Sequence, residues 1–120
     1  MNNLDALCAT RAGDISENHT LPKSFETILR NSMGVLREEG VFAFYIYLLA
    51  NDDKGGKIIL DCIYNLLKNK NTGPLMDPKG DDERKGIIKI TEDLPSLLLA
   101  RQLIERTLTY ALYGLKGKKK

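Results

Sequence analysis

A chain of 120 residues is long enough for one compact domain and too short for two ordinary ones. Its 42% hydrophobic and 28% charged residues, with a net charge of +2, exclude a disordered protein and indicate a globular one that builds its own core. The longest nearly unbroken apolar run, Val41–Ala50, covers about half of a bilayer span, and the N-terminal residues lack the pattern of a signal peptide. We therefore expect a cytoplasmic protein with no membrane partner.

Apolar residues at helical spacing dominate the first half of the chain, and no stretch alternates long enough to predict a strand. A short helix is expected over residues 3–12, followed by a polar connection over 13–20. Pro22 opens the first long helix, because proline suits a first turn, and Gly40 ends it. Val41–Ala50 is apolar nearly all round, which predicts a helix at the centre of the domain.

The second half begins with a turn over 51–56, which holds two aspartates and two glycines. An amphipathic helix is expected over 57–70. Asn69–Asp82 contains two prolines and two glycines, which predicts a long surface loop and a candidate for disorder. A short helix over Glu83–Thr91 and the longest helix, over Leu94–Leu115, complete the chain.

These elements predict one all-α domain over residues 1–120, a single compact bundle of five or six helices. Its charge is unevenly divided: residues 1–53 carry four basic and eight acidic side chains. Residues 101–120, which include the basic tail 116–120, carry six basic side chains against Glu105 alone. This uneven charge suits a protein that binds a polyanion with one surface or stacks head to tail on copies of itself. The alternative is that the basic residues form only a solvated tail.

The rare residues exclude most catalytic chemistry. His19 is the one histidine, and it lies in a polar connection, where it is too isolated to support a catalytic triad. The two cysteines, Cys8 and Cys62, lack the number and spacing of zinc ligands. Cys62 lies within an apolar helical pattern, and we expect it to be a small buried hydrophobe.

Paired carboxylates occur in two predicted turns, at Asp52-Asp53 and at Asp81-Asp82. Adjacent carboxylates in turns usually cap helices or are solvated, and a divalent metal would need further ligands. We therefore expect no enzyme activity, no metal site and no cofactor.

Three cations are spaced by seven residues in the first long helix: Lys23, Arg30 and Arg37. Seven residues bring a side chain back to within about 20° of its start and advance it by about 10.5 Å. The three cations are therefore expected to form one stripe, which is typical of a surface that follows a phosphate backbone. The alternative is a solvated face whose cations pair with Glu26 and Glu38.

The last helix carries two apolar faces. Its core-facing stripe is predicted to comprise Leu94, Leu97, Leu98, Ile104, Leu108, Leu112 and Leu115. Arg101 and Glu105 lie four residues apart within that stripe and are placed to pair. A second apolar patch lies on the opposite side and comprises Leu99, Leu103 and Tyr110. Such a helix is either enclosed in its own domain or covered by another chain, and we expect a partner chain here, with Arg106 at the rim.

Two stretches resemble a known family. Leu21–Ala50 (LPKSFETILRNSMGVLREEGVFAFYIYLLA) combines an amphipathic helix, a break at a glycine and an apolar helix. Leu94–Leu115 (LPSLLLARQLIERTLTYALYGL) is a long closing helix rich in Leu, Ala and Tyr. Together they resemble the small helical subunit of type III-B CRISPR effectors, the Cmr complex. This resemblance implies a non-catalytic antiviral-defence protein whose copies stack along the guide–target duplex while other subunits cut RNA.

The partners that the resemblance implies are other subunits of the effector, guide and target RNA, and copies of the chain itself. The cations expected on its nucleic-acid-binding surface are Lys23, Arg30, Arg37, Arg101 and Arg106. The alternative is a helical adaptor or dimerisation module without a nucleic-acid role, in which the basic residues only keep the protein in solution.

Overall fold

Six α-helices and one 3-10 turn make up the part of the chain that the structure, a computed structural model, describes. It describes residues 4–18, 21–69, 72, 75–77, 79 and 82–118. The helices are α1 (Leu4–Ser16), α2 (Phe25–Glu39), α3 (Val41–Ala50), the 3-10 turn η1 (Asp52–Lys54), α4 (Gly56–Leu67), α5 (Glu83–Thr91) and α6 (Leu94–Lys118). The expected all-α bundle of five or six helices is confirmed.

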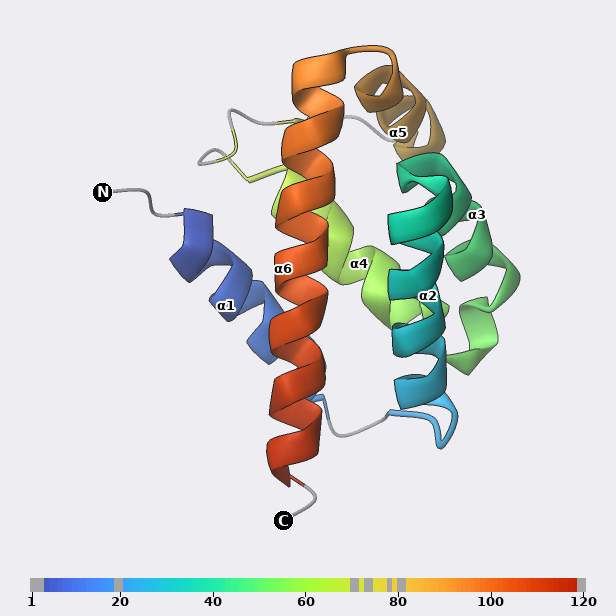
Figure 1. Cartoon of the computed structure of the whole chain (residues 1–120), viewed down its shortest axis with the longest axis vertical. Coiled ribbons are helices and arrows are strands. Elements are labelled where there is room, and N and C mark those ends of the chain that lie inside the picture. Colours follow the sequence, from blue (N-terminus) through green and yellow to red (C-terminus); the bar gives the residue numbers. More distant parts are fainter. Residues whose placement is uncertain are drawn as a thin grey trace.

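The long helix α6 organises the arrangement. It has α1 on one side and α2 on the other; α3 lies beyond α2, and α5 lies beside the start of α6 (Figure 1). α1 packs most extensively against α6 and also contacts α4, and α3 packs against α2, α4 and α5. The N-terminal helix and the C-terminal helix are therefore direct neighbours.

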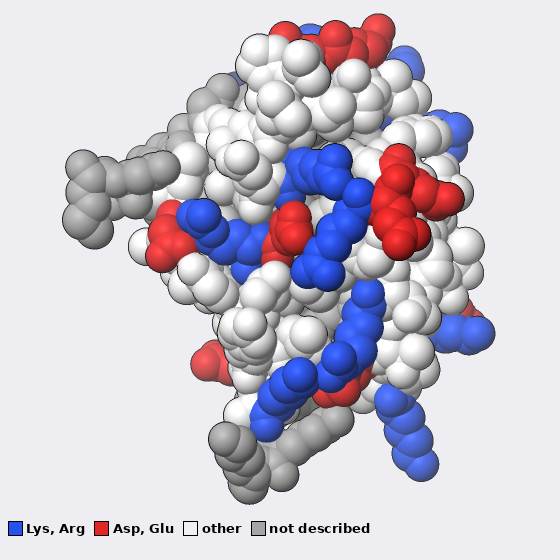
Figure 2. All heavy atoms as spheres, viewed as in Figure 1, with Lys and Arg blue, Asp and Glu red and all other residues white. Residues whose placement is uncertain are grey.

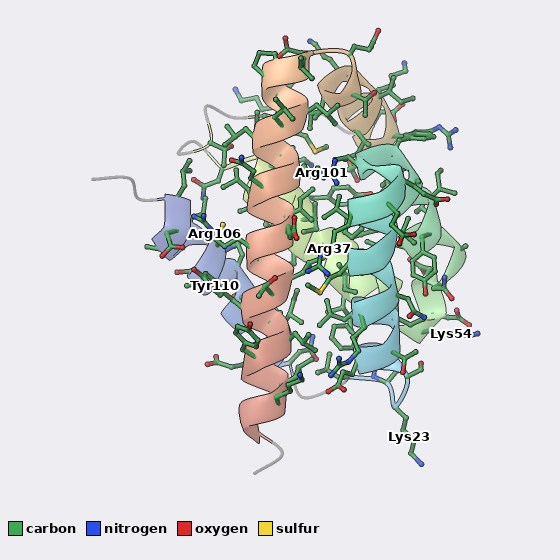
Figure 3. All side chains as sticks on the ribbon, in the orientation of Figure 1. Lys23, Arg37, Lys54, Arg101, Arg106 and Tyr110 are labelled. Atoms are coloured by element: carbon green, nitrogen blue, oxygen red, sulfur yellow. The ribbon has the colours of Figure 1, made fainter. Side chains whose placement is uncertain are left out.

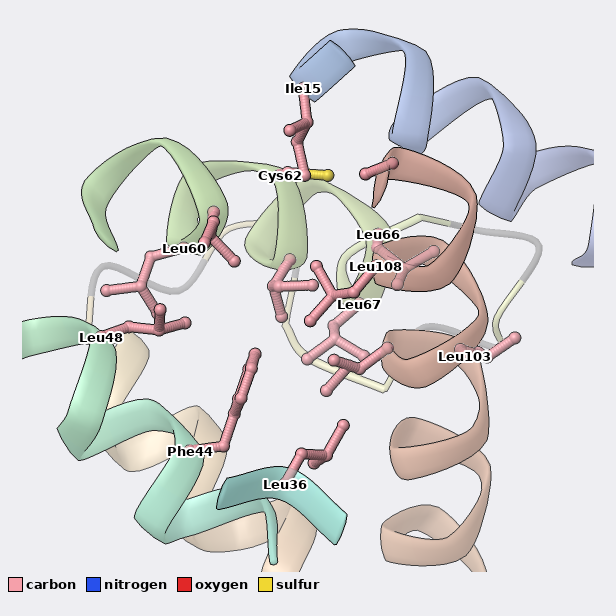
Figure 4. Packing of buried hydrophobic residues seen from close by; sticks show 14 of the residues in the cluster. Ile15, Leu36, Phe44, Leu48, Leu60, Cys62, Leu66, Leu67, Leu103 and Leu108 are labelled. Carbon is pink, nitrogen blue, oxygen red and sulfur yellow. The ribbon is translucent and has the colours of Figure 1, made fainter. Parts of the chain in front are cut away.

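One cluster of buried hydrophobic side chains joins all six helices. Phe44 of α3, Leu66 and Leu67 of α4, and Leu108 of α6 are almost completely buried and converge in it (Figure 4). Cys62 is 4% exposed and is a free thiol, so its expected role as a small buried hydrophobe is confirmed. A single core of this kind is what one helical domain requires.

Local chemistry accounts for several helix ends. The Asp82 carboxylate accepts a hydrogen bond from the backbone N–H of Lys85 at 3.1 Å, so it caps α5 as expected. Gly40 ends α2 with a φ of 99°, a conformation that other residues rarely adopt. At the start of α2, the N–H of Phe25 donates to the carbonyl of Pro22, so a turn precedes the helix and delays it by three residues.

Two helices are longer than the sequence predicts. α1 continues through Gly13 to Ser16, where a polar connection is expected, because Ala12 and Ile15 extend its buried side. α6 continues to Lys118, which includes part of the expected basic tail. No helix within the described ranges, α6 included, is both long and apolar enough to cross a membrane.

α3 is not the central helix that its apolar sequence predicts. It lies at the outer edge of the bundle (Figure 1), and Ile46 and Leu49 are 38% and 41% exposed. Only one side of α3 meets the other helices, through residues such as Phe44 and Leu48. The prediction was wrong because an apolar sequence does not reveal how many neighbours a helix has.

The predicted surface loop Asn69–Asp82 is partly built into the core. Thr72 and Met76 are buried, and Met76 packs so closely on Gly86 that a side chain there would approach its Cε to 2.7 Å. The expectation of disorder falls largely on residues outside those described. His19 also lies outside them.

Candidate nucleic-acid interface

Lysine and arginine side chains gather over α6 and the adjoining side of α2 on one face of the molecule (Figure 2). Arg37 of α2 and Arg101 of α6 lie between the two helices, and Arg106 lies on the α1 side of α6 (Figure 3). Arg30 is exposed and lies two turns before Arg37, on the same side of α2. We call the surface formed by Arg30, Arg37, Arg101 and Arg106 the basic face.

Lys23 does not belong to this surface. α2 begins at Phe25, so Lys23 lies in the preceding turn and the helical spacing does not apply to it. Its side chain extends away from the other labelled cations, beyond the end of α2 (Figure 3). The predicted stripe therefore keeps Arg30 and Arg37 and loses Lys23.

The centre of the basic face joins α2 to α6. Arg37 Nε donates to Glu105 Oε1 at 2.8 Å, and Arg101 Nη2 donates to the backbone carbonyl of Arg37 at 2.6 Å. The second bond satisfies a carbonyl in the last turn of α2, which has no partner within the helix. The predicted pair between Arg101 and Glu105 is wrong, because both side chains reach across to α2 instead of along α6.

These contacts leave most of the arginine donors available. Arg37 is bonded to Glu105 through Nε alone, and its side chain is 54% exposed. A guanidinium group has five N–H donors in a planar fork, and an exposed ion pair contributes only about 0–1 kcal/mol. A phosphate group can therefore be bound without first breaking a strong interaction.

For Arg30 the structure agrees in part with the alternative of a solvated helix face whose cations pair with nearby glutamates. Its Nη2 lies 3.4 Å from Glu26 Oε2, one turn earlier on α2, and the arginine side chain is 47% exposed. The other predicted acidic partner is not used, because Arg37 turns to Glu105 instead of Glu38. One of the two expected local pairs is thus present.

Arg106 lies where α6 meets α1. Its Nη1 is 3.4 Å from Asp5 Oδ1, and the Tyr110 hydroxyl donates to the same oxygen at 2.6 Å. This hydrogen bond raises the pKa of Tyr110, because the carboxylate favours the protonated phenol. Sequence reasoning missed Asp5, since no local pattern connects residues 105 positions apart.

The second apolar patch of α6 is covered by the chain itself. Leu103 is 3% exposed, Leu99 packs against the core, and Tyr110 is held to α1 through Asp5. The predicted partner interface at Leu99, Leu103 and Tyr110 is therefore wrong. α1 occupies the place that a partner chain was expected to take.

The first apolar stripe of α6 is also shorter than expected. Ile104, Leu108 and Leu115 are buried, but Leu94 is 65% exposed and Leu98 is 52% exposed. α5 packs beside this end of α6 (Figure 1), but Leu94 and Leu98 lie on a side of α6 that remains exposed.

A hollow of about 750 Å³ lies between the loop, α5 and the start of α6. Lys85, Lys89, Asp82 and Asp93 are among the residues that line it, and the two carboxylates cap α5 and α6 through backbone N–H groups. These two carboxylates therefore serve helix ends. Within the described ranges, no three His, Cys, Asp or Glu side chains lie close enough to hold a metal ion.

Compared with protein-family models, with curated proteins and with solved structures, the chain matches none of them. Function is therefore inferred from the chemistry of the basic face. That face offers guanidinium groups on a helical support, and this arrangement suits an extended anion.

Proposed function

We propose that this chain is a non-catalytic subunit that contacts the nucleic-acid backbone through the basic face, within an RNA-guided CRISPR interference complex. The observation that carries the nucleic-acid contact is the gathering of Arg30, Arg37, Arg101 and Arg106 on one face of two helices far apart in the sequence. The CRISPR setting, with other effector subunits, guide and target RNA and further copies as partners, rests on the resemblance of Leu21–Ala50 and Leu94–Leu115 to the small Cmr subunit.

The geometry of the arginines supports a backbone contact more than a base-specific one. Arg37 and Arg106 are each held by one carboxylate, Glu105 and Asp5, and each keeps further donors. Such anchoring limits the rotamer freedom that binding would otherwise remove, while the remaining N–H groups can engage phosphate oxygens in pairs. Contacts of this kind are independent of base sequence and weaken as salt is added.

Binding to RNA tests this proposal. The double variant Arg30→Gln with Arg37→Gln should lower the affinity for a single-stranded or hybrid RNA by at least about tenfold at low salt, without loss of helicity. Glutamine is preferred to glutamate because a carboxylate at position 37 would face Glu105. Fluorescence anisotropy with a labelled oligonucleotide gives the affinity, and circular dichroism gives the helicity.

The matched control is Lys54→Gln with Lys57→Gln, which removes the same charge elsewhere. Both lysines are exposed, and Lys54 lies on the far side of α2 from α6 (Figure 3). The control should bind RNA nearly as well as the wild-type chain. Equal loss in both double variants, or no binding by the wild-type chain alone or with candidate partner subunits, would overturn the proposal.

A second candidate is the helical adaptor, which the exposed leucines of α6 favour. Leu94 and Leu98 are 65% and 52% exposed, one turn apart, and such a pair suits a protein contact. In that function the chain has no affinity for RNA even at low salt, and replacing both leucines with serine abolishes capture of its protein partner. The RNA titration therefore separates the two candidates.

A further inference from the structure

We propose that Tyr113 is a stacking platform for an unpaired nucleobase, which makes single-stranded nucleic acid the ligand of this face. The inference rests on the proposed nucleic-acid function and names the ligand class for the same surface. Single-stranded RNA and single-stranded DNA share the required chemistry, an unpaired base between phosphate groups.

Tyr113 differs from the other tyrosines of the chain. Its side chain is 64% exposed, whereas Tyr45 is buried and Tyr47, Tyr64 and Tyr110 are half-buried. Within the described part of the chain, the hydroxyl of Tyr113 has no hydrogen-bond partner and its ring has no aromatic or cationic neighbour. The ring therefore adds little to the core and leaves its face free for a ligand.

The position of Tyr113 on α6 places it among cations. It follows Arg106 by seven residues, so the two side chains leave α6 within about 20° of each other, about 10.5 Å apart along the axis. Lys116, which is also exposed, comes about 4.5 Å further along. Figure 2 shows basic side chains along α6 on this face. A strand that follows α6 would thus meet a cation, an aromatic ring and a second cation in turn.

This order of side chains discriminates between single and double strands. A paired base hides both of its faces within the duplex stack, so only an unpaired base can lie against the Tyr113 ring. Proteins that bind single strands combine a basic track with aromatic side chains, and one stacked base is worth roughly 5- to 150-fold in affinity. Because every base has a π-face, the preference is for strandedness and not for sequence.

Replacing the ring tests the stacking. Tyr113→Ala should weaken binding of a short oligouridine and an oligothymidine of equal length by roughly 5- to 150-fold, and should leave binding of a duplex unchanged. Tyr113→Phe keeps the ring and should bind both single strands nearly as well as the wild-type chain.

A spectroscopic readout follows from the composition, because the chain contains no tryptophan. Tyr113→Trp introduces a single reporter at the platform, and Leu49→Trp introduces one on the exposed side of α3 as a control. Oligouridine should quench the fluorescence of the Tyr113→Trp variant and leave that of Leu49→Trp unchanged. Inorganic polyphosphate, which carries no bases, should bind the basic face without quenching either reporter.

The outcomes separate this inference from the proposed function. If RNA binds and depends on Arg30 and Arg37, but Tyr113→Ala binds it with full affinity and Tyr113→Trp is not quenched, the stacking platform is refuted and the backbone contact stands. Equal weakening of duplex and single strands by Tyr113→Ala would also refute the platform. If the wild-type chain binds no RNA, both proposals fail.

Discussion

Cys8 and Cys62 lie where α1, α4 and α6 meet, and both thiols are buried. Cys62 Sγ donates to the carbonyl of Arg11 at 3.2 Å, and Cys8 Sγ to the carbonyl of Leu103 at 3.6 Å. Burial raises the pKa of the Cys62 thiol from 9.0 to about 12, and it raises the pKa of Cys8 as well. Both cysteines are therefore packing residues whose neutral form the fold requires.

This burial predicts that the protein loses stability in alkali. In the unfolded chain Cys62 releases its proton above pH 9.0, whereas in the folded chain it keeps it up to about pH 12, so unfolding becomes favoured between these values. The free energy of unfolding should fall by about 1 kcal/mol more in the wild-type chain than in Cys62→Ala between about pH 8 and about pH 10. Urea unfolding at both pH values measures it, and identical pH dependence in the two proteins would contradict it.

For single residues, the sequence predicts which side chains are buried better than it predicts which side chains they contact. The apolar spacing around Cys62 is enough to predict a buried thiol, because the spacing itself defines the side of the helix that faces the core. The pair Arg37–Glu105 joins residues 68 positions apart, and its formation depends on how α2 is set against α6. That relation is a property of the packed bundle and is not encoded in either helix alone.

The turn between α3 and α4 depends on two consecutive glycines. Gly55 has a φ of 113°, a left-handed conformation that favours glycine. At Gly56 an added Cβ would lie 2.2 Å from the carbonyl oxygen of Leu48, where the backbone of α3 approaches α4. The sequence predicts this turn correctly from its glycines, but not the close contact that makes the second glycine necessary.

Gly56→Ala should therefore destabilise the protein by about 3 kcal/mol or more, because the clash is with backbone and cannot be relieved by a rotamer change. The matched control is Gly34→Ala in the middle of α2, where nothing lies within 4 Å of the new Cβ. That change should stabilise the protein by about 0.5–1 kcal/mol, since alanine is the better helix former. Denaturant unfolding of both variants gives the comparison, and equal effects would refute the close approach of α3 and α4.

Helix boundaries follow the sequence closely where a strong local signal is present. Val41–Ala50 and Glu83–Thr91 have the predicted limits, because a glycine precedes the first helix and an aspartate caps the second. α1 extends beyond its predicted end because Ile15 is stabilised by contact with other helices. Tertiary packing, rather than local propensity, sets that boundary.

In the molecule as a whole, α1 packs against α6 and covers its second apolar side (Figure 1). The sequence shows that α6 has two apolar sides, but not whether the chain itself or another protein covers them. Four of the five cations predicted to contact nucleic acid, Lys23 being the exception, share a face only because α2 and α6 are neighbours. The sequence therefore predicts most of the cations of the candidate site, but not how they are arranged on the surface.

Because α1 covers one side of α6, substitutions at two leucines of α6 should affect stability very differently. Leu103→Glu should destabilise the protein by about 3 kcal/mol or more, because it buries an unpaired carboxylate under α1. Leu98→Glu should change stability by no more than about 0.5 kcal/mol, because its side chain is 52% exposed. Thermal unfolding measures both, and a stable Leu103→Glu variant would mean that α1 does not cover this side.

The most direct test of the backbone contact is the salt dependence of RNA binding. If the four arginines of the basic face each neutralise one phosphate of a single strand, the logarithm of the binding constant should fall with the logarithm of the salt concentration with a slope of about −3. Removing two of them, with Arg30→Gln and Arg37→Gln, should reduce that slope by about 1.4. A binding constant that does not change with salt concentration, or a slope that the two substitutions leave unchanged, would contradict the proposed contact.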